Sequence, residues 1–351
     1  MERGFRDRDY LETREGFFFT VVGNVHPEGR VIAYLKNIPS QSGKWGRGEK
    51  RYERALKYYT MNYIAETIDF LTKCYPHYVQ RLDADNITFS SVPVNRILKH
   101  YHPEEALASI SRREGIDALQ KKTSELARLL SETSDVQPNC FGVTGSLLIG
   151  IHNPAFSDID LTVYGRENSL AVKKTLKNLL KNQESPVKRL IAENLHEWCK
   201  NTCELYHLTM EEAYKLFKRR WNRGMFKDTF FSVHPVRVER EVEEKYGDKT
   251  LIPIGIVDAE ARVVDSSNAL FMPARYVVKD VQITFGPNVE GIEEVVTYEG
   301  LYGDLVYEGE SLICRGKLEK VDDKRRNRTY HRILIGSQEA AGKDYIKPLF
   351  W

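Results

Sequence analysis

The sequence is short of cysteine, of net charge and of long apolar runs, and each shortage excludes a class of protein. The five cysteines form no disulfide framework, which favours a reducing, cytoplasmic location. No stretch reaches the roughly 18 consecutive apolar residues that a membrane-spanning helix needs. The opening stretch, MERGFRDRDYLETREG, is charged and contains no apolar segment, so we do not expect it to act as a secretory signal.

The formal net charge is only +2, yet the basic residues are gathered in clusters. Residues 215–227 hold six basic side chains and no acidic one, 315–332 hold eight against three, and 44–57 hold six against two. Each cluster alone is explained by a solvated helix face or loop. Together they favour RNA or DNA as a partner, because clustered cations attract phosphate even in a nearly neutral protein.

At 351 residues the chain is long enough for two or three domains. We expect an N-terminal α+β domain over residues 1–100. Strands are predicted there at 16–25 and 30–35, a glycine-rich loop at 42–48, and a long helix from about Glu49 to Lys73. The apolar stripe of that helix would consist of Tyr52, Leu56, Tyr59, Tyr63 and Leu71.

Residues 101–245 alternate helical and extended patterns, and the pattern becomes purely extended after Thr229. Helices are predicted from Pro103 to about Ser131 with a break at Gly115, at 168–182, at 185–201 and from Thr209 to Trp221, and strands at 139–144 and 158–164. Six candidate strands with Gly and Asp/Asn turns follow. We therefore expect an α+β protein with a mixed central sheet over 101–245 and a C-terminal β-barrel-like domain over 246–351.

The stretch GSLLIGIHNPAFSDIDLTVYG carries residues that folding alone does not require. Gly145 and Ser146 follow a predicted strand and open a short helix, where free backbone N–H groups and a hydroxyl favour anionic oxygens. Asp158 and Asp160 flank Ile159 in the next strand, so both carboxylates should project from one face. Because Mg²⁺ prefers carboxylates together with phosphate oxygens, the spacing predicts a magnesium and phosphate site.

This pattern resembles the signature of the DNA-polymerase-β-like nucleotidyltransferase superfamily, in which Gly-Gly or Gly-Ser precedes Asp-apolar-Asp-apolar. The chain also looks like a group of uncharacterised archaeal predicted nucleotidyltransferases, through RDRDYLETREGFFFTVVGNVHPEGRVIAYLK and GVTGSLLIGIHNPAFSDIDL. The resemblance implies transfer of a nucleoside monophosphate from a nucleoside triphosphate to an acceptor hydroxyl, with Mg²⁺ or Mn²⁺. Asp158 and Asp160 would then be catalytic and hold the metal, and Gly145, Ser146 and Ser157 would bind the nucleotide.

A third carboxylate, usual on a later strand in active members of this superfamily, is not obvious here. The best candidate strand, DTFFSVHPVRV, shows Ser232 and His234 where an acid is expected, so His234 becomes a candidate metal ligand. Other acids that could complete the site are Asp228, Glu239, Asp258 and Asp265. Three readings stay open: an active enzyme using His234 or a displaced acid, a one-metal enzyme, or a nucleotide-binding pseudoenzyme.

Three weaker signals concern binding rather than catalysis. His196, Cys199, Cys203 and His207 are zinc-type ligands, but on one straight helix their outer pair would lie about 16 Å apart, which favours a packed helix face. SGKWGRGEKR lacks the spacing of a Walker loop, although Lys44, Trp45 and Arg47 could clamp a phosphate and stack a base. RRWNRG and the strands around Arg315 and Lys317 could contact nucleic acid or be purely structural.

We therefore expect a magnesium-dependent nucleotidyltransferase whose acceptor is RNA, DNA, a protein or a small molecule, with the basic clusters favouring nucleic acid. The alternative is a catalytically inactive protein of this fold that binds nucleic acid. A purely structural partner protein would show neither property. We expect no membrane partner.

Overall fold

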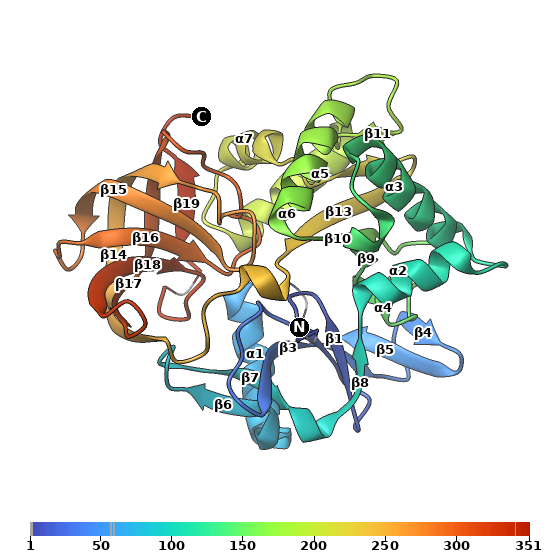
Figure 1. Cartoon of the computed structure of the whole chain (residues 1–351), viewed down its shortest axis with the longest axis horizontal. Coiled ribbons are helices and arrows are strands. Elements are labelled where there is room, and N and C mark those ends of the chain that lie inside the picture. Colours follow the sequence, from blue (N-terminus) through green and yellow to red (C-terminus); the bar gives the residue numbers. More distant parts are fainter. Residues whose placement is uncertain (1–2, 57, 59, 341) are drawn as a thin grey trace.

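Three β-sheets and seven α-helices organise the residues that the structure describes (Figure 1). We use a computed structural model, which describes residues 3–56, 58, 60–340 and 342–351. The chain fills three lobes in order: an N-terminal sheet at the bottom of Figure 1, a central sheet with most of the helices at the upper right, and a C-terminal sheet at the left. The expected α+β class is confirmed.

The N-terminal sheet has eight strands and one α-helix packed against it. The strands are β1 Tyr10–Thr13, β2 Phe18–Val21, β3 Arg30–Pro39, β4 Trp45–Arg47, β5 Lys50–Arg54, β6 Val79–Leu82, β7 Ile87–Pro93 and β8 Ile97–Tyr101, and the helix is α1 Met61–Cys74. Leu71 of α1 and Phe19 and Leu35 of the sheet are fully buried in one core, where burial removes apolar surface from water.

The prediction of one helix from Glu49 to Lys73 is wrong over its first part. Residues 50–54 form β5, which pairs with β4 in a hairpin, and α1 begins only at Met61. Tertiary packing overrides the helical pattern here, because buried Tyr52 contacts Phe18 from the sheet at a ring distance of 5.2 Å. Tyr59 and Lys57, which belonged to the predicted stripe and basic cluster, lie outside the described residues.

The central sheet has five strands in the order β11-β12-β13-β10-β9, and its helices pack around it. The strands are β9 Phe141–Val143, β10 Ile159–Tyr164, β11 Val187–Lys188, β12 Arg223–Phe226 and β13 Thr229–Val236. The helices are α2 Pro103–Arg112, α3 Ala118–Ser134, α4 Gly145–Leu148, α5 Arg166–Leu179, α6 Ala192–Leu205 and α7 Met210–Arg219. Strand β10 runs parallel to β13 and antiparallel to β9. Capping boxes at Asp117 and Thr209 fix the starts of α3 and α7, as expected for Thr209.

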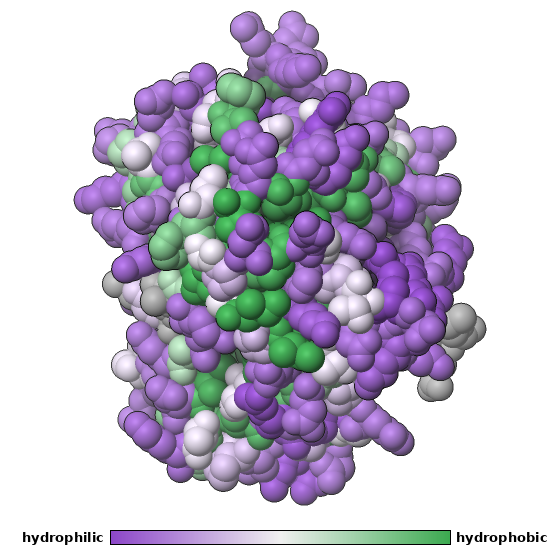
Figure 2. Space-filling view, turned by 90° about the vertical axis from the view of Figure 1, so that its left-hand side faces the viewer, coloured by the Kyte–Doolittle hydropathy of each residue, from purple (hydrophilic) through white to green (hydrophobic). Residues whose placement is uncertain are grey.

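The C-terminal sheet has six strands: β14 Lys249–Asp265, β15 Ala274–Phe285, β16 Ile292–Thr297, β17 Ser311–Asp323, β18 Arg328–Ile335 and β19 Tyr345–Pro348. The order is β14-β15-β16-β18-β17-β19, and β14 pairs with β17 as well. The expected β-rich region is therefore present. Apolar residues gather in a band across the side of the molecule on which this sheet lies (Figure 2). Within the described part of the chain, no helix combines the length and apolar character needed to cross a membrane.

Candidate functional site

The two aspartates of the motif lie at the start of β10 and act on one another electrostatically. Ile159 and Leu161 are fully buried in the central core, so the intervening Asp160 projects from the opposite face of the strand. The negative charge of Asp160 is the main reason that the pKa of Asp158 rises to about 6, with desolvation second. The two carboxylates are therefore close enough to repel one another, which is typical of a cation or proton site.

Asp160 is bound by two residues of the neighbouring parallel strand, β13. Asp160 stands opposite Ser232 in the register, and the Ser232 hydroxyl donates a hydrogen bond to Asp160 Oδ1. His234 Nε2 lies 2.7 Å from Ser232 Oγ and 3.7 Å from Asp160 Oδ1. Because the Ser232 proton points to Asp160, the imidazole N–H donates to Ser232 Oγ. Burial alone would raise the pKa of Asp160, but these partners hold that pKa well below its usual range.

His234 is neutral at physiological pH. Burial lowers its pKa to about 4, and the positive charge of Arg8 adds to this effect. The position predicted to carry a third acid is thus filled by a hydroxyl and a neutral imidazole. In this arrangement His234 Nε2 donates a hydrogen bond to Ser232 Oγ, and Nδ1 of the same imidazole keeps a lone pair.

Gly145 permits the close approach of Asp160 to the turn after β9. Its φ is +69°, and a Cβ at this position would lie 2.9 Å from Asp160 Oδ2. The backbone N–H of Thr144 donates to Asp160 O at 2.8 Å, which fixes the turn against β10. Ser146 follows Gly145 and is half-buried. The predicted neighbours Gly145, Ser146 and Asp160 are therefore assembled in one place.

Ser157 has a local structural role in the loop before the aspartates. Its hydroxyl accepts a hydrogen bond from Asn153 N at 3.0 Å, and its own N–H donates to Asn153 O at 2.9 Å. This closed turn presents Asp158 at its end.

The remaining acids considered as third ligands are engaged elsewhere. Glu239 binds Arg6, Asp228 binds Lys122, and Asp258 binds Arg315, each through an ion pair of 2.5–2.8 Å. Asp265 accepts a hydrogen bond from Ser267 N at 2.7 Å. In the described part of the chain no group of three or more His, Cys, Asp or Glu side chains has metal-site geometry.

The residues present nevertheless suit one hard cation of the Mg²⁺ type. Such an ion is commonly held by one or two carboxylates, with water and substrate phosphate supplying its other ligands. Asp158 and Asp160 provide these carboxylates, and their mutual repulsion is the charge pattern that a cation relieves. A second ion of the two-metal type would lack a third carboxylate, because Ser232 occupies that register position.

Three cationic residues of the N-terminal lobe reach this site, and the motif analysis did not identify them. The positive charges of Arg54 and Lys36 act on Asp158, and that of Arg8 acts on Asp160 and His234. Arg54 stacks on Trp45 at 4.8 Å, and Trp45 in turn packs on Phe156 of the site loop at 5.7 Å. Only Arg54 had a signal in the sequence, as part of the cluster 44–57.

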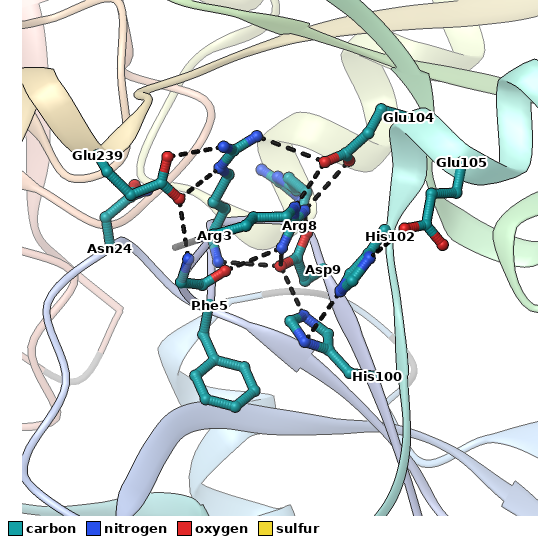
Figure 3. A network of polar contacts seen from close by, with 12 residues as sticks. Arg3, Phe5, Arg8, Asp9, Asn24, His100, His102, Glu104, Glu105 and Glu239 are labelled. Atoms are coloured by element: carbon teal, nitrogen blue, oxygen red, sulfur yellow. Dashed lines mark hydrogen bonds and ion pairs between the residues drawn. The ribbon is translucent and has the colours of Figure 1, made fainter. Parts of the chain in front are cut away.

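Arg8 is placed by a polar network around the first described residues (Figure 3). Arg3 binds Asp9 at 2.7 Å and Glu104 at 2.5 Å, and so ties the start of the chain to α2. Arg8 itself has a φ of 71°, in the left-handed region that costs a non-glycine residue about 1–2 kcal/mol. Its carbonyl accepts from Thr144 Oγ1 at 2.8 Å, directly before Gly145. Such local strain beside paired aspartates is typical of a functional position.

A cavity of about 1030 Å³ lies between the three lobes, beside the partners of the two aspartates. Arg8, Arg54 and His234 line it, together with residues of the C-terminal sheet such as Tyr298. Its wall carries many arginines alongside acidic residues. Five of these arginines belong to the three basic clusters of the sequence, namely Arg54, Arg223, Arg325, Arg326 and Arg332, and the others come from elsewhere in the chain. Some residues of the three clusters form ion pairs within the protein, for example Lys227 with Glu125 and Arg328 with Glu293.

The proposed zinc-type residues stand on α6 and the turn after it, and they pack separately. Cys199 is 2% exposed, Cys203 Sγ lies 3.7 Å from Met210 Sδ, and His207 stacks on Tyr345 at 6.2 Å. The packed helix face expected from the spacing is met by Cys199 and Cys203, whereas His196 and His207 are exposed.

Fold and site together define a mixed α+β protein with a paired-aspartate site on its central sheet. The chain is 31% identical over 347 residues to "Uncharacterized protein MJ1086" of the archaeon Methanocaldococcus jannaschii, a match that covers 97% of this chain and 98% of the relative. The chain therefore belongs to the same family as that archaeal protein. No family model and no solved structure matches the chain.

Proposed function

We propose that the protein transfers a nucleoside monophosphate from a nucleoside triphosphate to an acceptor hydroxyl in a magnesium-dependent reaction. The observation that carries this proposal is the pair Asp158 and Asp160, which repel one another, with Asp160 lying against Gly145. The resemblance of the motif to nucleotidyltransferases supports the same reaction.

In this proposal, residues of the central lobe bind the metal and residues of the N-terminal lobe bind the triphosphate. Asp158 and Asp160 would hold Mg²⁺, and this ion would supply charge neutralisation at the phosphate oxygens and a more acidic acceptor hydroxyl. Arg8, Lys36 and Arg54 supply positive charge on the N-terminal side, where the triphosphate would be held. Ser146 and the adjacent backbone would orient the phosphates.

The transfer step forms one bond and breaks one. The acceptor oxygen bonds to the α-phosphorus while the bond from that phosphorus to the oxygen bridging the β-phosphate breaks, and pyrophosphate leaves. The acceptor proton needs a base. His234 is our candidate, because its imidazole is neutral, lines the cavity and lies beside Asp160.

The replacement of a third acid by Ser232 favours a second candidate function. A protein with only two carboxylates could keep nucleotide and nucleic-acid binding without transfer. The two functions differ in turnover, so one assay separates them.

The test is incorporation of labelled nucleotide from each triphosphate into bulk RNA, DNA or protein with Mg²⁺ or Mn²⁺. Asp158→Asn and Asp160→Asn should each reduce incorporation at least 100-fold by the magnitude typical of catalytic electrostatics. Asp228→Asn is the matched control, since Asp228 is a mostly exposed acid at the start of β13. Absence of incorporation with every acceptor, alongside metal-independent nucleotide binding, would favour the inactive binding protein.

A further inference from the structure

Two arginines at the far end of the parallel strands line the cavity, and neither forms an ion pair with a carboxylate among the described residues. Arg237 follows β13 and Arg166 opens α5 directly after β10. Their guanidinium groups both donate to one neutral oxygen, Asn268 Oδ1, at 2.8 Å and 3.3 Å. All three residues line the cavity. Two cations that share a single amide oxygen retain most of their capacity to bind an anion.

The negative charges of Glu241 and Glu244 act on Arg237, but neither carboxylate forms an ion pair with it among the described residues. The Arg237 guanidinium lies 4.4 Å from the ring centre of Phe271. Burial lowers the pKa of Arg237, and the positive charges of Arg166 and Arg275 lower it further. The ring of Phe271 and the oxygen of Asn268 stabilise the guanidinium, but both groups are neutral and leave the positive charges in place.

The acids nearest to this pair are already occupied. Glu241 accepts from the backbone N–H groups of Arg166 at 2.8 Å and of Val238 at 3.2 Å, which fixes the start of α5. Glu244 pairs with Lys249 at 2.9 Å and with Arg275 at 3.5 Å. A ligand anion would therefore find the two guanidinium groups available.

A further cation, Arg223, lies on the same cavity wall, close to the partners of Asp160. Arg223 stands opposite Ser232 in the register of β12 and β13, and its buried Nε has no hydrogen-bond partner among the described residues. His234 and Arg237 are three steps apart along extended chain, which separates their Cα atoms by about 10 Å. This spacing is too long for one phosphate group and suits successive groups of a chain-like polyanion.

Aromatic rings line the same cavity. Tyr298 is 41% exposed, and Trp198 and Tyr246 are half-buried. A cavity lined by both cations and aromatic rings suits single-stranded nucleic acid, because unpaired bases stack on such rings while phosphates bind the arginines. Bases in a duplex cannot reach the rings in this way.

We propose that Arg166, Arg237 and Asn268 form a binding site for a backbone phosphate of a single-stranded nucleic-acid acceptor, whose terminal hydroxyl lies at Asp158 and Asp160. The inference rests on the proposed function and extends it, because it selects nucleic acid from the possible acceptors. Arg166 and Arg237 act in acceptor binding.

The experiment measures binding of a short fluorescent single-stranded RNA of mixed sequence to the full chain, without triphosphate or divalent cation. Arg166→Gln and Arg237→Gln should each weaken binding about three- to tenfold and reduce the salt slope by about 0.7. Arg128→Gln is the control, since Arg128 is an exposed arginine of α3 paired with Glu132. The control should bind as the unmodified chain does.

Asn268→Asp separates a binding role from a structural one. A carboxylate between the two arginines would neutralise them in place, so RNA binding should weaken at least as much as in Arg237→Gln while the melting temperature is kept or raised. If the two arginines only brace the fold, this variant should bind RNA unchanged.

The inference would be overturned if the unmodified chain did not bind RNA, or if Arg128→Gln lost as much RNA affinity as the two test variants. It would also be overturned if duplex RNA bound as tightly as single-stranded RNA. The same holds if Arg166→Gln and Arg237→Gln weakened binding of nucleoside triphosphate but not of RNA. The proposed function fails in a different way. If RNA binding depends on Arg237 but no nucleotide is ever incorporated, transfer is refuted and the phosphate site stands. If transfer occurs but is indifferent to both arginines, only the phosphate site is refuted.

Discussion

At the scale of single residues, the central feature is a pair of aspartates that the fold holds together against their repulsion. Asp158 and Asp160 were identified from sequence because their spacing of two places both on one strand face. The roles of Arg8 and Ser232 could not be derived in this way. Arg8 meets the site through a tertiary contact, the hydrogen bond from Thr144 Oγ1 to its carbonyl, and Ser232 meets Asp160 through the register of β10 and β13.

Asp158→Asn should stabilise the protein at neutral pH. Since the folded-state pKa of Asp158 is raised to about 6, its proton stabilises the fold at low pH, and that stability is lost as pH rises through about 6. The variant should therefore melt about 1–3 °C above the unmodified chain at pH 7.5. The difference should vanish below the ordinary aspartate pKa of about 3.9. Thermal melts across this range check the sign, and a variant less stable at pH 7.5 would refute the repulsion.

Gly145→Ala should displace Asp160, and Gly150→Ala should not. Both glycines have a φ of +69°, so alanine costs about 1 kcal/mol of unfolding free energy at either position. Only at Gly145 would the new Cβ meet Asp160 Oδ2, at 2.9 Å, whereas nothing lies within 4 Å at Gly150. Denaturant unfolding should show a larger loss for Gly145→Ala, together with weaker Mn²⁺ binding. Equal behaviour of the two variants would argue against the contact.

At the scale of elements, patterns with strong local signals were predicted well and those set by packing were not. The helices around Gly115 and after Thr209 form as expected, because caps and apolar stripes are local features. The helix predicted from Glu49 failed over 50–54, where a hairpin around Gly48 places Tyr52 in the core. That outcome depends on partners far along the chain.

Ser232→Asp should install the missing third carboxylate. The substituted side chain would face Asp160 across β10 and β13, so it should lower the melting temperature in EDTA through like-charge repulsion. Mn²⁺ should then raise the melting temperature more than in the unmodified chain, by binding the folded state. Ser232→Asn serves as the neutral control of similar size. A Mn²⁺ response no larger than that control's would mean that this register position does not face the metal site.

At the scale of the whole molecule, three lobes meet around one cavity, and the first residues of the chain hold two of them together. Arg6 donates to both carboxylate oxygens of Glu239, at 2.8 Å and 2.7 Å, and so links the N-terminal lobe to the segment after β13. The contact joins residues far apart in sequence. No local pattern could therefore have predicted it.

Arg6→Gln and Glu239→Gln should be coupled in a double-mutant cycle by about 1–3 kcal/mol. Burial alone would raise the pKa of Glu239, but the hydrogen bonds from Arg6 lower this pKa to about 2. The stabilisation is therefore present above the ordinary glutamate pKa of about 4.3 and is lost as pH falls towards about 2. Denaturant unfolding at neutral pH and at about pH 3 measures both effects. Additive single variants at neutral pH would show that the lobes are not joined here.

The most direct test of the whole account is calorimetric titration of Mn²⁺ into the full chain and into Asp160→Asn at several pH values. The account predicts one site in the unmodified chain, whose apparent affinity falls about tenfold per pH unit below about 6 as Asp158 becomes protonated. It predicts no binding at this site in the variant. Binding that is unchanged in Asp160→Asn, or no binding by the unmodified chain with a triphosphate present, would contradict a metal site at these aspartates.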